Sequence, residues 1–163
     1  MSLKSRLFHK GTLLELDILD VAYGGKGIAK VPTDDGDFTV FVPNAIQGQR
    51  VRARVSLCKR RHAEARITAV LKRAPGEVET PHQAIPGAPY ITLPLKAQRE
   101  WKERTTLDVY RRIGGVPDLD ARYAGWVDSP SGFHYRNKME YSFAAIGRSP
   151  GDDPDAEFED GFF

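Results

Sequence analysis

The stretch Arg50-Val51-Arg52-Ala53-Arg54-Val55-Ser56-Leu57 decides how the first half of this 163-residue chain is folded. Polar and apolar side chains alternate along it, and successive side chains of a β-strand point to opposite faces. The apolar residues at positions 51, 53, 55 and 57 are therefore expected to face a core, and the arginines at 50, 52 and 54 to face solvent. The stretch predicts a half-buried strand whose outer face is cationic.

Four further segments also have strand patterns. Leu14, Leu16 and Ile18 alternate with Glu15, Asp17 and Leu19, and Thr33-Asp34-Asp35-Gly36-Asp37 is a strong hairpin signal. In all, strands are expected at residues 12–20, 28–31, 38–42, 50–57 and 63–70. Five short antiparallel strands within about 60 residues predict a small closed barrel of the oligonucleotide-binding type.

Charge is distributed unevenly between the two halves of the chain. Residues 1–73 hold 14 Lys and Arg against 7 Asp and Glu, whereas residues 74–163 hold 10 against 15. A basic first half indicates that a polyanionic partner, if there is one, meets the barrel. No apolar run approaches the roughly 18 residues of a membrane helix, and the start lacks a secretion signal, so a cytoplasmic protein is expected.

The second half has a different organisation. Prolines at 75, 81, 86, 89 and 94 favour a linker or an extended wrap over residues 75–94. Pro94 suits the start of a helix that runs to about Ile113, where Gly114-Gly115 is a stop signal. Residues 132–144 end in a strand-like alternation, and an acidic run closes the chain.

Several of these motifs resemble the RNA (uracil-C5) methyltransferases, which methylate uridine in ribosomal or transfer RNA. The first 70 or so residues are similar to the TRAM domain of that family, a small RNA-binding barrel, and later blocks are similar to the opening of its central domain. The matching pieces are Tyr23-Gly24-Gly25-Lys26-Gly27-Ile28-Ala29, Phe41-Val42-Pro43-Asn44-Ala45, Gly48-Gln49-Arg50-Val51, Ala63-Glu64-Ala65-Arg66-Ile67, Glu79-Thr80-Pro81, Gln98-Arg99-Glu100-Trp101-Lys102, Arg112-Ile113-Gly114-Gly115 and Tyr135-Arg136-Asn137-Lys138-Met139-Glu140.

The resemblance implies a mainly β (α+β) chain with two parts. Residues 1–73 would be a five-stranded, OB-like TRAM barrel, and residues 74–163 a linker, one helix and a partial α/β central domain. The S-adenosylmethionine domain of the family would lie beyond Phe163, so no catalytic residue is expected in this chain, which should be inactive alone. The family's four-cysteine iron–sulfur site is not expected here, because Cys58 is the only cysteine.

RNA-binding residues are expected mainly on the barrel. Arginine suits phosphate contacts because its planar fork makes bidentate hydrogen bonds. Arg136 and Lys138 in the second part are open to two readings, RNA contact or a structural role. The candidates are Lys26, Arg50, Arg52, Arg54, Lys59, Arg60, Arg61, Arg66, Arg136 and Lys138.

Other readings of these motifs are structural. The Lys26 loop lacks the Gly-x-x-x-x-Gly-Lys-Ser/Thr order of a P-loop, so a hairpin loop is expected, with a phosphate contact compatible. Cys58 is expected to be structural, and the four histidines have no metal-ligand spacing. The sequence thus predicts the RNA-binding part of a 23S rRNA (uracil-5) methyltransferase, a monomer that binds rRNA in preference to tRNA and no membrane. The alternative is a stand-alone RNA-binding module.

Overall fold

The first part of the chain is one six-stranded sheet in the structure, a computed structural model that describes residues 8–80 and 88–134. All five predicted strands are present, and the first of them is divided in two. The strands are β1 (Leu13–Asp17), β2 (Asp20–Ala22), β3 (Lys26–Thr33), β4 (Gly36–Pro43), β5 (Arg50–Cys58) and β6 (His62–Lys72).

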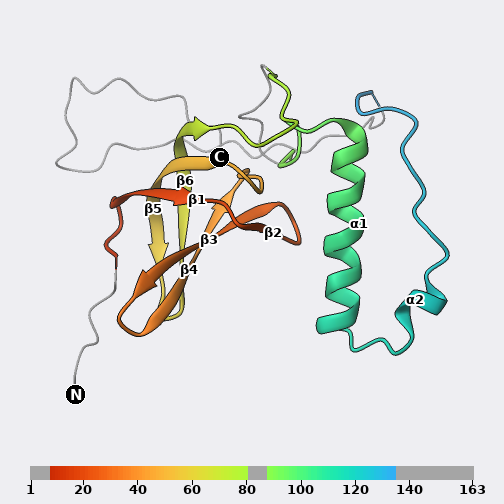
Figure 1. Cartoon of the computed structure of the whole chain (residues 1–163), viewed down its shortest axis with the longest axis horizontal. Coiled ribbons are helices and arrows are strands. Elements are labelled where there is room, and N and C mark those ends of the chain that lie inside the picture. Colours follow the sequence, from red (N-terminus) through yellow and green to blue (C-terminus); the bar gives the residue numbers. More distant parts are fainter. Residues whose placement is uncertain (1–7, 81–87, 135–163) are drawn as a thin grey trace, which may run out of the picture. The chain divides into compact units, whose positions relative to one another are not determined.

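The sheet closes into a barrel because β1 and β2 act as one bent strand. The sheet order is β1-β5-β6-β4-β3-β2, so β1 pairs with β5 at one edge while β2 pairs with β3 at the other. Only Ile18 and Leu19 separate the two strands, and the Leu19 N–H donates to the carbonyl of Ile28 at 2.8 Å. All pairings are antiparallel except that of β4 with β6. Figure 1 shows the curled sheet, which has the closed five-stranded design of an oligonucleotide-binding barrel.

Small and branched apolar side chains fill the barrel. Val40, Val42, Val51 and Ala53 are completely buried, as the alternation of their strands requires. The core consists of Leu16, Ile18, Ala29, Val40, Val42, Ala45, Val51, Ala53, Val55, Cys58, Ala63 and Ala65.

The alternation predicted for β5 is wrong at its last residues. Leu57 was expected to face the core, but 43% of it is exposed, and Cys58 is buried in its place. The register of β5 against β6 shifts between Val55 and Leu57, and such a bulge adds one residue and reverses which side chains point inward. The structural reading of Cys58 agrees with this position in the core.

Two turns have the backbone that their glycines suggested. Thr33 pairs with Gly36 across the β3–β4 hairpin, and Gly36 has a φ of 103°. Gly24 and Gly25 also have positive φ, but Lys26 and Gly27, expected in this loop, already lie in β3. The loop before β3 is therefore shorter than the sequence suggested.

Two helices follow the barrel, and the longer one is where the sequence placed it. Helix α1 (Leu95–Arg112) begins after Pro94 and has Ile113 as its C-cap, and α2 (Leu119–Arg122) is a single turn. Beyond β6 the described residues contain no strand. The predicted strand-like block from residue 135 onward lies outside the described residues.

A second apolar cluster joins α1 to one end of the barrel. Val21 and Ile46 of the barrel pack there with Tyr90 and Leu93, and Trp101 of α1 lies against them. The Arg104 guanidinium stacks on the Trp101 ring at 3.9 Å and forms an ion pair with Asp20.

Residues up to Trp126 thus form one compact unit, and residues from Val127 onward belong to another. The expected domain boundary at residue 73 stays a prediction. Among the described residues, no helix is long and apolar enough to cross a membrane.

Candidate nucleic-acid interface

The arginine stripe of β5 faces solvent as predicted, but a neighbouring carboxylate holds two of its members. In the β1–β5 register, Glu15 lies opposite Arg52. Arg52 Nη2 donates to Glu15 Oε1 at 2.9 Å, and Arg50 Nη2 donates to Glu15 Oε2 at 3.3 Å. Arg54 has no ion-pair partner among the described residues. The charge available to an anion on this stripe is therefore smaller than three arginines imply.

The two arginines also set the protonation of Glu15. The hydrogen bond from Arg52, followed by that from Arg50, lowers the pKa of the Glu15 carboxyl below its usual value. A Glu carboxyl is ionised at neutral pH in any case, and the lowered pKa means that Glu15 also competes with an anion for both guanidinium groups in mild acid.

A second group of cations surrounds the outer face of β3, β4 and β6. Lys26 Nζ donates to Glu64 Oε1 at 2.9 Å, and this hydrogen bond is the main reason why the pKa of Glu64 is lowered. Lys30 Nζ donates to Thr39 Oγ1 at 2.9 Å, and Arg66 is exposed on β6 opposite Arg54. This face therefore carries cations from β3 and β6, the two strands on either side of β4.

The turn between β5 and β6 adds three exposed cations at one end of this face, where His62 pairs with Thr39. The Lys59 N–H donates to the His62 carbonyl at 2.8 Å, which fixes a tight turn with Arg60 and Arg61 at its tip. None of the three has an ion-pair partner within the described ranges. Since β4 and β6 are parallel, the acidic β3–β4 turn with Asp34 and Asp35 lies at the same end.

The structure thus divides the predicted RNA-binding residues into two groups. Arg50 and Arg52 lie with Glu15 on the β1–β5 side. Lys26, Arg66 and the Lys59–Arg61 turn surround the β3–β4–β6 face, and Arg54 lies between the groups. Arg136 and Lys138 lie outside the described residues. Whether any of them contacts RNA stays a prediction.

The sequence reading missed two features of these surfaces. The partnership of Glu15 with β5 depends on the register between strands that are 35 or more residues apart, which no local pattern specifies. Phe41 was placed in the expected strand 38–42 and in a motif that resembles the family, but it was given no binding role, although Val40 and Val42 beside it take the inward positions. Its outward orientation could have been found from that alternation.

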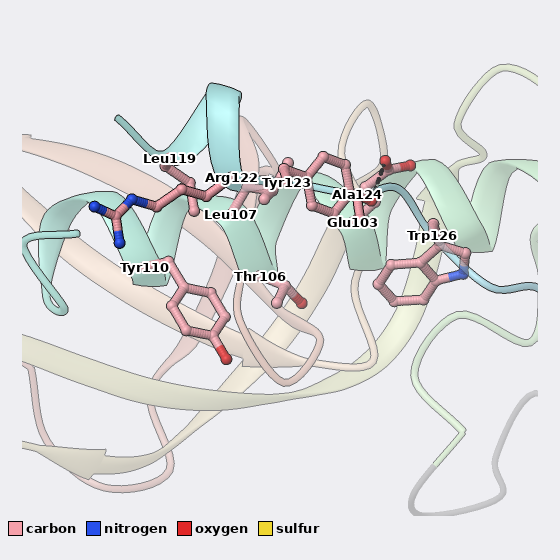
Figure 2. A pocket seen from close by; sticks show the side chains of 9 residues that line it. All are labelled: Glu103, Thr106, Leu107, Tyr110, Leu119, Arg122, Tyr123, Ala124 and Trp126. Atoms are coloured by element: carbon pink, nitrogen blue, oxygen red, sulfur yellow. Dashed lines mark hydrogen bonds between the residues drawn. The ribbon is translucent and has the colours of Figure 1, made fainter. Parts of the chain in front are cut away.

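A separate hollow lies between α1 and residues 119–126 (Figure 2). Its volume is about 230 Å³, and most of its lining is apolar or aromatic, including Leu107, Tyr110 and Trp126. Two of the polar side chains that line it bond to each other, because Tyr123 Oη donates to Glu103 Oε1 at 2.5 Å. That hydrogen bond is the main cause of the raised pKa of Tyr123.

The described residues contain no His, Cys, Asp or Glu group suited to a metal ion.

Comparison with known proteins agrees with the barrel geometry. Residues 8–68 match the TRAM domain family. These residues form a TRAM domain. Its bounds contain β1 to β5 and most of β6, so the family match and the closed barrel describe the same part of the chain.

Over a longer stretch, the TRAM domain and the residues after it resemble proteins named as uncharacterized RNA methyltransferases. The protein of Halalkalibacterium halodurans is 29% identical over 143 residues, which are 86% of this chain and 30% of that protein. The protein of Clostridium acetobutylicum is 32% identical over 143 residues, 85% of this chain and 29% of that protein. The protein of Nitratidesulfovibrio vulgaris is 31% identical over 144 residues, which are 86% of this chain and 30% of that protein. The chain thus spans about 30% of the length of these relatives, and the match is consistent with an RNA methyltransferase family.

Matches were also found among solved structures. The solution structure of a conserved protein of Methanococcus maripaludis is 32% identical to this chain, with a TM-score of 0.34. The match covers 42% of this chain and all of that protein.

Proposed function

We propose that this chain is the RNA-binding part of an RNA methyltransferase, in which the TRAM domain holds the RNA and another part of the protein transfers the methyl group. The observation that carries the proposal is the combination of a TRAM barrel, with cations on its outer strands, and relatives named as RNA methyltransferases. Cations on a rigid barrel surface favour the phosphate backbone, which dominates nucleic-acid affinity.

We further propose a uracil-C5 methyltransferase that uses S-adenosylmethionine and acts on 23S rRNA. The support is the resemblance of the barrel motifs and of the block Tyr135-Arg136-Asn137-Lys138-Met139-Glu140 to that family. In such an enzyme the methyl donor would bind outside the residues of this chain, and the TRAM domain would supply position and affinity. Phosphate contacts position RNA without reading its sequence, so the choice of uridine would lie elsewhere.

Among the predicted contacts we rank the β5–β6 turn above the arginine stripe. Lys59, Arg60 and Arg61 are exposed and have no ion-pair partner among the described residues. Arg50 and Arg52 each form an ion pair with Glu15, and a phosphate must replace Glu15 or bind beside it. Binding of RNA to the turn should therefore release more counterions from the RNA than binding to the stripe, although both surfaces carry three positive charges.

The experiment compares two triple variants of equal charge in a salt titration with a short single-stranded RNA. For single strands, the slope of log affinity against log salt is about −0.7 for each phosphate neutralised. Replacing Lys59, Arg60 and Arg61 by Gln should flatten the slope by roughly 2 units. Replacing Arg50, Arg52 and Arg54 by Gln should flatten it by about 1 unit or less.

The outcomes separate the parts of this proposal. Unchanged slopes in both variants, with RNA still bound, would place the phosphate contacts away from both surfaces. A larger effect of the stripe variant would reverse the ranking. A wild-type chain without measurable affinity for RNA at low salt would overturn the RNA-binding function itself.

A further inference from the structure

Phe41 occupies an unusual position for a phenylalanine in a small barrel. It lies on β4 between Val40 and Val42, both fully buried, so its side chain belongs to the outer face. Across the sheet it is paired with Ile28 of β3 on one side and with Glu64 of β6 on the other. It contributes nothing to the barrel core, and an outward aromatic ring is available for another role.

The surroundings of Phe41 make an apolar centre on this outer face. The His62 ring lies 5.6 Å from the Phe41 ring between centroids, and the two planes are inclined by 77°. The rings therefore meet edge to face and are not stacked in parallel. Ile28, Phe41 and His62 are each only partly buried, so a planar group from solvent can reach this centre.

Cations surround this apolar centre. Lys26 and Lys30 flank Ile28 along β3, and the Lys59–Arg61 turn leads directly into His62. Two acids lie in the same cross-strand row, and each has a cationic partner: Glu64 pairs with Lys26 at 2.9 Å, and Asp20 of β2, opposite Ile28, pairs with Arg104. An aromatic centre within a cationic rim complements a ligand that is planar and apolar in one part and anionic in another.

Resting on the proposed RNA-binding function, we propose that Phe41 is a stacking platform for an unpaired base of single-stranded RNA, with Ile28 and His62 beside it. Aromatic side chains in positively charged grooves bind single strands in this way, because every base has a π-face. A duplex does not fit the site, since its base faces are covered by their neighbours and only unstacked bases can be inserted. The backbone on either side of the base would meet Lys30 and the Lys59–Arg61 turn.

The test measures binding of the whole chain to one short single-stranded RNA and to the same strand with abasic central nucleotides. Phe41→Leu keeps the apolar bulk and removes the ring, and it should weaken binding of the normal strand by about tenfold. The slope against salt should not change, because no charge is removed. Phe41→Trp should bind at least as well as wild type, and Phe133→Leu is the matched control outside the barrel.

Each outcome bears on the proposal. Wild-type protein should prefer the normal strand over the abasic one, and Phe41→Leu should lose that preference. If the wild type binds both strands with equal affinity, the stacking proposal fails, whatever the variants show. If RNA binds and Phe41→Leu binds like wild type, this proposal fails while the proposed function stands. If the wild type binds no RNA, both fail.

Discussion

The Glu15 carboxylate binds Arg50 and Arg52, two of the predicted RNA-binding residues. We expect Glu15→Gln to raise RNA affinity and to steepen the dependence of log affinity on log salt by roughly 0.7 to 1.4 units, because one or two more phosphates become neutralised. The measurement is a fluorescence titration at several salt concentrations. Asp108→Asn is the control, since it removes one exposed acid that pairs with Arg112 on α1 at 3.7 Å.

The Glu15 prediction has a clear opposite outcome. If Glu15 instead holds the two guanidinium groups in the geometry that RNA needs, Glu15→Gln will lower the affinity. A gain of equal size in Asp108→Asn would show that only the net charge of the chain matters.

Gln49 is a buried polar residue that ties the end of the barrel to the segment that leaves it. It is 1% exposed; its Oε1 accepts from the Ile46 N–H at 3.0 Å, and its Nε2 donates to Glu77 Oε1 at 2.7 Å. Gln49→Leu would leave the Ile46 N–H without its acceptor and would remove one of the two hydrogen bonds that the Glu77 carboxylate accepts, so we expect the free energy of unfolding to fall by about 2 kcal/mol in urea denaturation.

The neighbouring Gln47 provides the matched control for this loss. It is exposed and makes one hydrogen bond, from Nε2 to the Leu19 carbonyl at 2.8 Å. Gln47→Leu should change the free energy of unfolding by no more than about 0.5 kcal/mol. Equal losses in the two variants would mean that the buried network of Gln49 adds no stability.

At the scale of elements, the loop between β2 and β3 shows how the segment after the barrel packs against it. Gly24 and Gly25 have similar φ values of 85° and 81°. A Cβ on Gly25 would lie 2.3 Å from Pro89 Cβ, whereas one on Gly24 would meet nothing within 4 Å. Both alanine variants carry the backbone strain of positive φ, but only Gly25→Ala should displace Pro89 and cost about 1–3 kcal/mol more.

Urea denaturation of the two variants measures this difference. Limited proteolysis is the second readout, because a displaced Pro89 should make the chain between β6 and α1 more accessible in Gly25→Ala alone. Identical behaviour of the two variants would show that this packing does not hold the segment in place.

Elements with strong local signals could be predicted from the sequence. The period-2 patterns gave the strands, and Pro94 with Gly114-Gly115 gave the bounds of α1, because these signals act within a few residues. The bulge that exposes Leu57 was not predictable, since it arises from the pairing of β5 with β6. The Glu15 ion pairs were missed for the same reason: the register between distant strands decides which side chains meet.

At the scale of the whole molecule, the chain should bind RNA without binding the methyl donor. Residues 1–163 contain no glycine-rich cofactor loop, and Cys58, the only cysteine, is buried in the barrel core. Isothermal titration with S-adenosylmethionine should therefore give no binding heat, and incubation with RNA should give no methylated product. Micromolar affinity for the donor would show that part of the cofactor site lies within these residues.

The way in which the barrel closes also has a consequence for its synthesis on the ribosome. β1 emerges first, but its partner β5 begins only at Arg50, and β6, which joins β5 to β4, ends at Lys72. Until Lys72 has left the exit tunnel, the nascent chain can form the β3–β4 hairpin but not the closed barrel. During this time its early strands have unpaired edges and solvent-exposed valines. Such a nascent chain is prone to aggregate and is a substrate for chaperones.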